Sequence, residues 1–229
     1  MPVCSMPSRR FRRGALPLAA LALCCGLSAR QPAWAAELDG VRFPDTMRVG
    51  GTTLYLNGIG LRTYSVARIH IYVAALYLAH QGSDPDVILH SAEPHLLMVT
   101  FKHDVSAKAS RDAWREGLER NCQAPCQLDP ADMAQFLAGV PDMHAGDSYG
   151  LFFHQQGAAI TLNGQQAGVI SKPAFAQALL ATFLGPRPAA PELKQNLLGA
   201  YPGAAPGASA PGTAAPGAAP PHSALINPR

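Results

Sequence analysis

The fold is decided by residues 52–78, which read TTLYLNGIGLR (52–62), TYSVA (63–67) and RIHIYVAALYL (68–78). The first and last of these segments are rich in β-branched and aromatic residues, which favour extended backbone. The segment between them is short enough to be a turn. The sequence therefore predicts two neighbouring strands joined by a short connection.

The pattern continues beyond this pair of strands. Ser106 is a typical N-cap for the amphipathic segment that follows it, and Pro173 and Gly185 bracket a later helix. The further strands are expected at 95–102, 149–154, 158–162 and 167–170, and the helices at 106–121, 129–137, 173–184 and 191–198. Strands, then helices, then hairpins and a last helix predict an α+β domain with a mainly antiparallel sheet.

The N-terminus has the features of an export signal. Four arginines at positions 9, 10, 12 and 13 precede an apolar run at 14–27, and a small-x-small pattern follows at Ala33-Trp34-Ala35. This order is typical of a secretory signal peptide, and the run of about 14 residues is too short to span a bilayer. We expect residues 1–36 to be cleaved and the protein to be periplasmic or secreted, with an uncleaved anchor as the alternative.

The charge of the exported part argues against some partners. The chain has 18 Lys and Arg and 15 Asp and Glu, but five arginines lie in the first 36 residues and the first acidic residue is Glu37. The remainder therefore carries 13 positive and 15 negative side chains. No basic stripe indicates binding to nucleic acid or to an anionic membrane, and no transmembrane segment is expected after the signal.

The C-terminus differs in composition from the rest. From Tyr201 to about Pro221 the chain is almost wholly Ala, Gly and Pro, which cannot bury enough apolar surface to offset the entropy of ordering. Residues 200–229 are therefore expected to be a disordered tail. The segment 37–199 remains as one domain of ordinary size.

Two cysteines remain after the predicted signal, Cys122 and Cys126. An even pair in an oxidising compartment favours a disulfide, which would fix the end of the predicted helix 106–121. The C-x-x-x-C spacing without further cysteines argues against a zinc or redox site. The scattered histidines suggest no metal site, and the sequence calls for no cofactor.

A candidate site lies in the first two strands. On a regular strand, Gly58, Gly60 and Arg62 share one face with Leu54 and Leu56, and the glycines leave room beside the guanidinium. Tyr72 would offer a hydroxyl on the partner strand. Arginine in an apolar setting calls for an anion, either an internal acid or a ligand. The alternative is an exposed edge arginine, with the glycines serving a β-bulge.

These residues resemble a known family. The stretch LNGIGLR (56–62), ten residues before YVAALYL (72–78), is similar to the chalcone isomerase-like family, especially its exported bacterial members. Further similarity lies at 114–121, 167–184 and 193–199, so that the resemblance covers nearly all of 40–199. It implies an open-faced β-sandwich, in which a large antiparallel sheet has helices on one face and a ligand cleft between them.

The resemblance also implies roles for single residues. Arg62 matches the arginine that holds the substrate phenolate in plant chalcone isomerases, and Tyr72 falls on their catalytic threonine. Asn121 matches an asparagine that lines the plant site, whereas Trp114 replaces a tyrosine. Fatty-acid-binding relatives use an arginine and a tyrosine at the positions of Arg62 and Tyr72 to hold a carboxylate.

Three functions follow as hypotheses. The favoured one is binding of a small amphipathic acid, fatty or aromatic, without turnover, through Arg62 and Tyr72 in an apolar cleft that Gly58, Gly60, Trp114 and Asn121 help to form. The second is an intramolecular lyase that cyclises a chalcone or similar enone, with Arg62 and Tyr72 as catalytic groups. The third is an envelope interaction protein with a vestigial cleft, in which Arg62 would pair with an internal acid.

Overall fold

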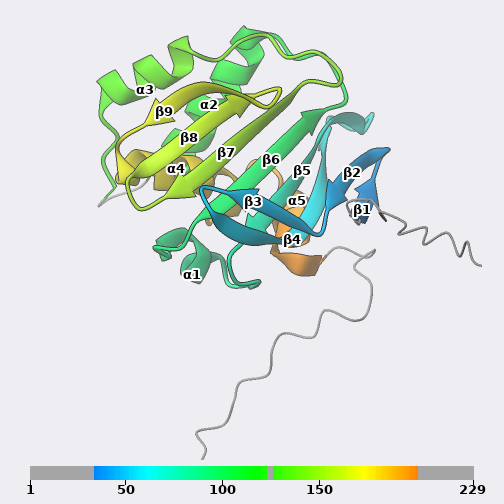
Figure 1. Cartoon of the computed structure of the whole chain (residues 1–229). Helices are drawn as coiled ribbons and strands as arrows, with labels where there is room; N and C mark the ends of the chain where they lie inside the picture. Colours follow the sequence, from blue (N-terminus) through cyan, green and yellow to red (C-terminus); the bar gives the residue numbers. More distant parts are fainter. Residues whose placement is uncertain (1–33, 123–125, 201–229) are drawn as a thin grey trace, which may run out of the picture. The chain divides into compact units, whose positions relative to one another are not determined.

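The structure, a computed structural model, describes residues 34–122 and 126–200 (Figure 1). The predicted signal peptide up to residue 33 and the predicted tail from residue 201 lie outside the described residues. The last three residues of the predicted signal, Trp34–Ala36, form part of the first strand.

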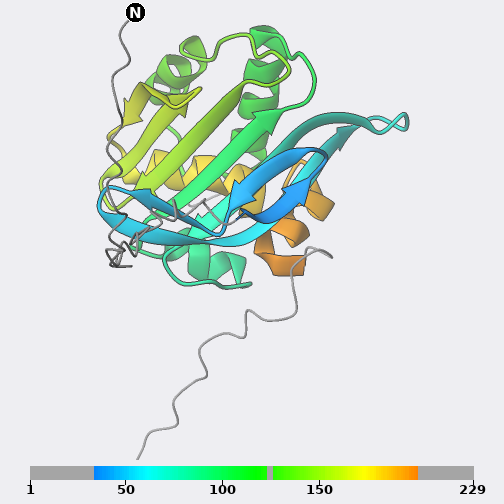
Figure 2. The ribbon, with the colours of Figure 1, turned by 45° about the vertical axis from the view of Figure 1, so that its right-hand side comes forward.

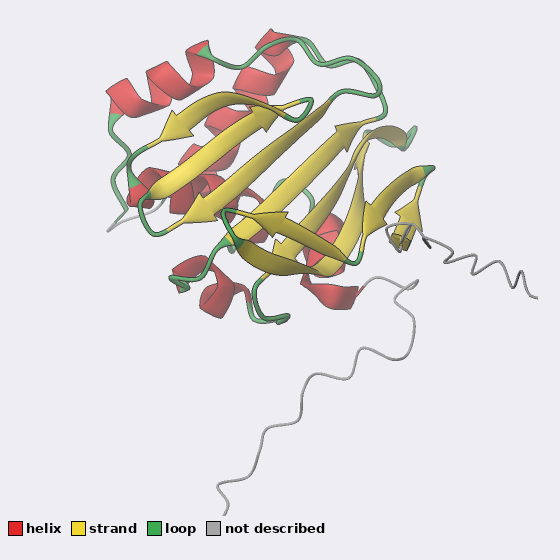
Figure 3. Ribbon diagram, in the orientation of Figure 1, coloured by secondary structure: helices red, strands yellow, loops and turns green. Residues whose placement is uncertain are grey.

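The core of the fold is a seven-stranded sheet in which every strand pairs antiparallel with its neighbours in sequence (Figure 3). The α+β fold and the antiparallel sheet predicted from the sequence are confirmed. In order across the sheet the strands are β3 (Thr46–Val49), β4 (Thr52–Tyr64), β5 (Ile69–Leu78), β6 (His95–Phe101), β7 (Ser148–His154), β8 (Gly157–Leu162) and β9 (Gln165–Ile170).

Helices cover one face of this sheet, and a two-stranded hairpin lies on the other face (Figure 2). The hairpin consists of β1 (Trp34–Leu38) and β2 (Val41–Pro44). The helices are α1 (Pro85–His90), α2 (Ala107–Asn121), α3 (Pro130–Ala138), α4 (Pro173–Leu184) and α5 (Pro191–Gln195), which runs into a final turn, η1 (Asn196–Ala200).

Local chemistry explains where the helices begin. The hydroxyl of Ser106 accepts a hydrogen bond from the Ala109 N–H, and the carboxylate of Asp129 accepts one from Ala131. Pro130 and Pro173 occupy first-turn positions, where the missing N–H has no intrahelical partner to lose. α1 was not predicted, although Asp84 followed by Pro85 is the same kind of start.

Alternation along the strands gives the sheet two apolar faces. Leu76, Leu97 and Leu151 pack toward the helices, while Val73 and Tyr77 pack toward the β1–β2 hairpin. All five side chains are buried. The hydroxyl of Tyr77 donates to the Pro44 carbonyl, so the second face is also tied to the hairpin by a hydrogen bond.

A β-bulge at Asn57 interrupts the alternation of β4. The register shifts between Leu56 and Gly58, so that Leu54 and Leu56 pack on the hairpin side and Gly58 faces the helices. The expectation that both leucines share a face with Gly58, Gly60 and Arg62 was therefore wrong. The extra residue in the bulge reverses the side-chain direction.

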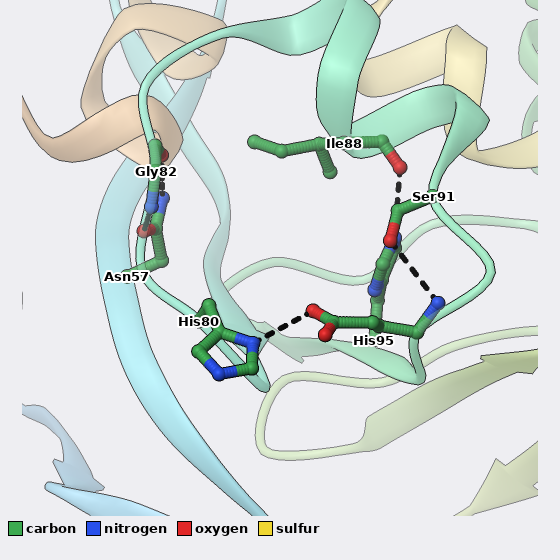
Figure 4. Close-up of polar contacts among 7 residues, drawn as sticks. Asn57, His80, Gly82, Ile88, Ser91 and His95 are labelled. Atoms are coloured by element: carbon green, nitrogen blue, oxygen red, sulfur yellow. Dashed lines mark hydrogen bonds and ion pairs between the residues drawn. The ribbon is translucent and has the colours of Figure 1, made fainter. Parts of the chain in front are cut away.

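The side chain of Asn57 holds this bulge in place. Its Nδ2 donates to the Gly82 carbonyl at 2.9 Å, and its Oδ1 accepts from the Gly82 N–H at 2.8 Å (Figure 4). The same Nδ2 donates to the Leu197 carbonyl at 2.8 Å. One side chain thus joins three segments that are far apart in the sequence.

Histidines fix the neighbouring connection between β5 and β6. His80 pairs with Glu93 at 2.9 Å, and the Nε2 of buried His95 donates to the Ile88 carbonyl at 2.8 Å (Figure 4). Among the described residues, the Nδ1 of His95 has no hydrogen-bond partner. Because Nε2 carries the proton in this arrangement, Nδ1 is an acceptor without a donor.

Gly58 and Gly60 serve helix packing rather than ligand access. A Cβ built on Gly58 would lie 2.1 Å from the Asn196 carbonyl oxygen, and one on Gly60 would lie 2.7 Å from Leu193 Cδ1. α5 and η1 therefore occupy the space beside both glycines. The prediction that these glycines border a ligand was wrong, because their missing side chains admit the C-terminal segment instead.

Replacing Gly58 by Ala should lower the free energy of unfolding by about 1–3 kcal/mol, because the new methyl group meets backbone that cannot move away without strain. Gly82→Ala is the matched control, since a Cβ there meets nothing within 4 Å, and it should change stability by less than about 0.5 kcal/mol. Denaturant titration measures both. Equal stabilities for the two variants would contradict the packing role of Gly58.

Candidate ligand-binding cavity

Two polar residues of the site, Arg62 and Tyr72, lie in one row with Phe101 across three strands. Arg62 of β4 is directly opposite Tyr72 of β5, which is directly opposite Phe101 of β6. A second register shift, between Arg62 and Thr63, makes Ile71 the unpaired residue, so that Ile71 and Tyr72 both reach the helix side. The structure therefore brings Arg62 and Tyr72 together, as expected from the sequence.

This row borders a cavity of about 1250 Å³ between the sheet and the helices. Residues of α2, α3 and α4 and of the segment 188–193 form the walls opposite the sheet. The volume exceeds the roughly 300–1,000 Å³ typical of small-molecule pockets. The predicted cleft between the sheet and the helices is therefore present.

Aromatic rings make up much of the wall. Trp114 contacts the rings of Phe136, Phe183 and Tyr149, with centroid distances of 5.3, 5.8 and 6.3 Å. Phe101 lies between Tyr72 and Tyr149, at 5.7 and 5.9 Å. These edge-on and tilted contacts are the arrangements that aromatic pairs prefer, so the rings form a well-packed apolar wall.

Trp114 is part of this wall and does not fill the cavity. Its indole is half-buried among the rings of α3, α4 and β7, and the open volume remains beside it. Trp114 thus lines the cavity from α2, and its contact with a ligand stays a prediction.

Arg62 is the one permanently charged group at the cavity without an acidic partner among the described residues. Its Nη1 donates to the Ala189 carbonyl at 3.1 Å. The other lysine and arginine that line the cavity are paired, Lys172 with Asp132 at 2.7 Å and Arg120 with Glu116. The guanidinium therefore keeps donors available for an anion.

Two phenols accompany this arginine. Part of the surface of Tyr72 faces the cavity, but its hydroxyl is surrounded by protein. This burial raises the pKa of Tyr72 to about 12, although the positive charge of Arg62 acts in the opposite direction. Burial, with a contribution from Tyr72, also raises the pKa of Tyr149. In the described part of the chain neither hydroxyl has a protein hydrogen-bond partner, so both remain neutral O–H donors at physiological pH.

Asn121 lies outside the cavity. Its Nδ2 donates to the carbonyls of Gly117 and Arg187, at 2.9 and 3.0 Å, and its Oδ1 accepts from the Arg187 N–H at 3.0 Å. The side chain thus fixes the end of α2 to the segment after α4. Its predicted part in ligand binding is not supported, because this backbone segment takes up both ends of the amide.

The sequence analysis missed Tyr149, Phe101 and Phe136. Tyr149 alternates with Leu151 along β7, which places both on the helix side. That alternation was visible in the sequence. Its place near Tyr72 depends on the pairing of three strands, which the sequence does not reveal.

The helix α2 ends at a disulfide. Cys122 and Cys126 form it, with their Cα atoms 5.1 Å apart.

Within residues 34–122 and 126–200 no group of three His, Cys, Asp or Glu is arranged to hold a metal ion. Over the same residues no helix is long and apolar enough to cross a membrane.

Comparisons with known proteins agree with this architecture. A fatty-acid binding protein of Arabidopsis thaliana has a similar structure, with a TM-score of 0.59 and 14% sequence identity over 70% of this chain and 93% of that one. At this identity the likeness concerns the fold alone. No curated protein matches the sequence. The family model described as chalcone isomerase-like matches residues 35–199, so the chain belongs to the chalcone isomerase-like family.

Proposed function

We propose that the protein binds a small amphipathic acid, fatty or aromatic, with its carboxylate at Arg62 and Tyr72 and its apolar part among the aromatic rings. The observation that carries this proposal is the guanidinium of Arg62, which lines a mainly apolar cavity and has no acidic partner among the described residues. Its planar fork of N–H donors matches the two oxygens of a carboxylate.

The neighbouring phenols fit the same ligand. Tyr72 and Tyr149 are neutral donors in a poorly hydrated setting, where a hydrogen bond to a charged acceptor is strong. The aromatic wall around Trp114 and Phe101 offers apolar contact beyond the polar end. The Arabidopsis protein of similar fold is itself named a fatty-acid binding protein, which supports this class of ligand.

Binding without turnover is favoured over catalysis. The plant isomerases that the sequence resembles use an asparagine and a tyrosine where this chain has Asn121 and Trp114. Asn121 is occupied with backbone groups, and Trp114 carries no hydroxyl. We place this binding protein in the periplasm or outside the cell, on the strength of the predicted signal peptide.

A second candidate function is an intramolecular lyase acting on a chalcone or similar enone. It is favoured by the pair of neutral phenols beside a guanidinium, which could hold a phenolate and stabilise the enolate that forms during ring closure. The third hypothesis, an interaction protein with a vestigial cleft, would be favoured by an internal acid paired with Arg62. No ion pair joins Arg62 to an acid among the described residues.

Arg62→Ala should weaken binding of a fatty acid by about 10- to 100-fold, because the charge-assisted hydrogen bonds to the carboxylate are lost. The matched control is Arg48→Ala, since Arg48 is exposed on β3 and does not line the cavity. Isothermal titration with lauric acid measures the affinities. Equal affinity for Arg62→Ala and wild type would place the carboxylate elsewhere.

The same proteins separate binding from turnover. With a hydroxychalcone, the absorbance of the substrate should fall no faster with protein than in buffer. An acceleration that disappears in Arg62→Ala and persists in Arg48→Ala would instead establish the lyase function.

Tyr72→Phe and Tyr149→Phe should each lower fatty-acid affinity by about tenfold, because each removes one hydroxyl donor and keeps the ring. Tyr55→Phe is the control, since Tyr55 is exposed and outside the cavity. Thermal unfolding verifies that all three variants remain folded. If all three bind as tightly as wild type, the phenols take no part in holding the ligand.

A further inference from the structure

Exposed apolar side chains gather on the connection between β4 and β5. Tyr64, Val66 and Ile69 have exposed fractions of 62%, 104% and 40%. They are three of the six large hydrophobic residues that are exposed in the described part of the chain. Single exposed apolar residues are ordinary, but three within six positions indicate a contact surface.

This connection projects beyond the rest of the sheet, as the cyan hairpin in Figure 2 shows. Its conformation is fixed locally, because the Arg68 N–H donates to the Ser65 carbonyl at 3.1 Å and the Ala67 N–H donates to the Ser65 hydroxyl at 3.2 Å. The apolar side chains therefore stay outward. Residues 64–69, called the tip below, form a convex surface. Such a surface fits a wide and deformable partner into which its side chains can insert.

The charge of the tip favours a lipid surface as this partner. Residues 62–70 include two arginines and a histidine and no acidic residue, and the histidine, His70, pairs with Asp39 at 3.1 Å. Arg68 is exposed beside Val66, where an arginine can reach lipid phosphate while its neighbours enter the apolar layer. Tyr64 has the apolar body and polar tip typical of side chains at membrane interfaces.

The tip also adjoins the ligand cavity. Arg62 and Tyr64 both line the cavity, and Val66 lies two residues beyond Tyr64. If Val66 and Ile69 enter a bilayer, the polar end of the cavity faces the headgroup layer, where the carboxylate of an amphipathic acid resides.

We propose that the turn Tyr64–Ile69 inserts into the surface of a lipid bilayer and holds the cavity at the membrane while its ligand enters or leaves. The ligand part of this statement rests on the proposed function, whereas the membrane contact is measured without a ligand.

The test is co-sedimentation of the purified protein with phosphatidylcholine vesicles, with and without phosphatidylglycerol. Wild type should bind both kinds, and more strongly when the anionic lipid attracts Arg68. Val66→Asp should reduce the bound fraction about tenfold, because a charge replaces a buried apolar group. Val87→Asp, at an exposed valine of α1, is the matched control and should bind like wild type.

Three outcomes would overturn the proposal. Wild type could fail to bind either kind of vesicle, or Val66→Asp could bind as well as wild type. Alternatively, wild type could form a dimer that Val66→Asp disrupts, without binding vesicles, which would make the tip an interface between two copies.

Lauric acid titration of Val66→Asp without vesicles separates this proposal from the function of the cavity. Its affinity should equal that of wild type, since Val66 does not line the cavity. Vesicle binding without lauric acid binding would contradict the proposed function alone, and the reverse would contradict membrane insertion alone.

Discussion

The close contact between β4 and the C-terminal segment determines the shape of this protein. Backbone atoms of Asn196 and Leu197 lie where a side chain on Gly58 would be, and Asn57 is hydrogen-bonded to the Leu197 carbonyl. With this end of β4 covered by α5 and η1, the cavity lies farther along the sheet. The segment that precedes α5 supplies the Ala189 carbonyl, which orients Arg62.

The charge at the cavity follows from this position of Arg62 beside the Ala189 carbonyl. The guanidinium of Arg62 has one protein hydrogen-bond partner among the described residues, the Ala189 carbonyl, and no acid there neutralises its charge. Its remaining N–H donors are therefore available to an anion. Tyr72 and Tyr149 cannot neutralise the guanidinium, because burial keeps their protons in place. The arrangement gains most from an anion that also brings apolar surface for the aromatic wall.

The sequence predicted most of the fold because its markers are local. Proline, glycine and capping residues bracket α2, α3 and α4, and the composition of 52–78 indicated the central strands. Asp84-Pro85 marked α1 in the same way and was overlooked. A β-bulge at the glycines was expected only as an alternative, and its place at Asn57 could not be predicted, because one of its fixing partners, Leu197, is 140 residues away. An inserted residue then reversed the expected direction of Leu54 and Leu56.

The candidate site was predicted only in part, because some of its contacts depend on segments that are distant in sequence. Arg62 and Tyr72 could be recognised because they lie on paired strands close in sequence and match a family pattern. The roles of Gly58, Gly60 and Asn121 were wrongly expected, since each depends on backbone from the C-terminal third of the chain. Tyr149 was missed because only the pairing of β5, β6 and β7 brings it beside Tyr72.

The central claim is that Arg62 holds a ligand carboxylate. Carbon-13 NMR of carboxyl-labelled octanoic acid, titrated with pH in the presence of excess protein, measures the pKa of the bound carboxyl group. A guanidinium partner favours the charged form, so this pKa should lie about 1–3 units below that of the free acid. A bound pKa equal to or above the free value would show that the carboxyl group is not at Arg62, and would contradict the account.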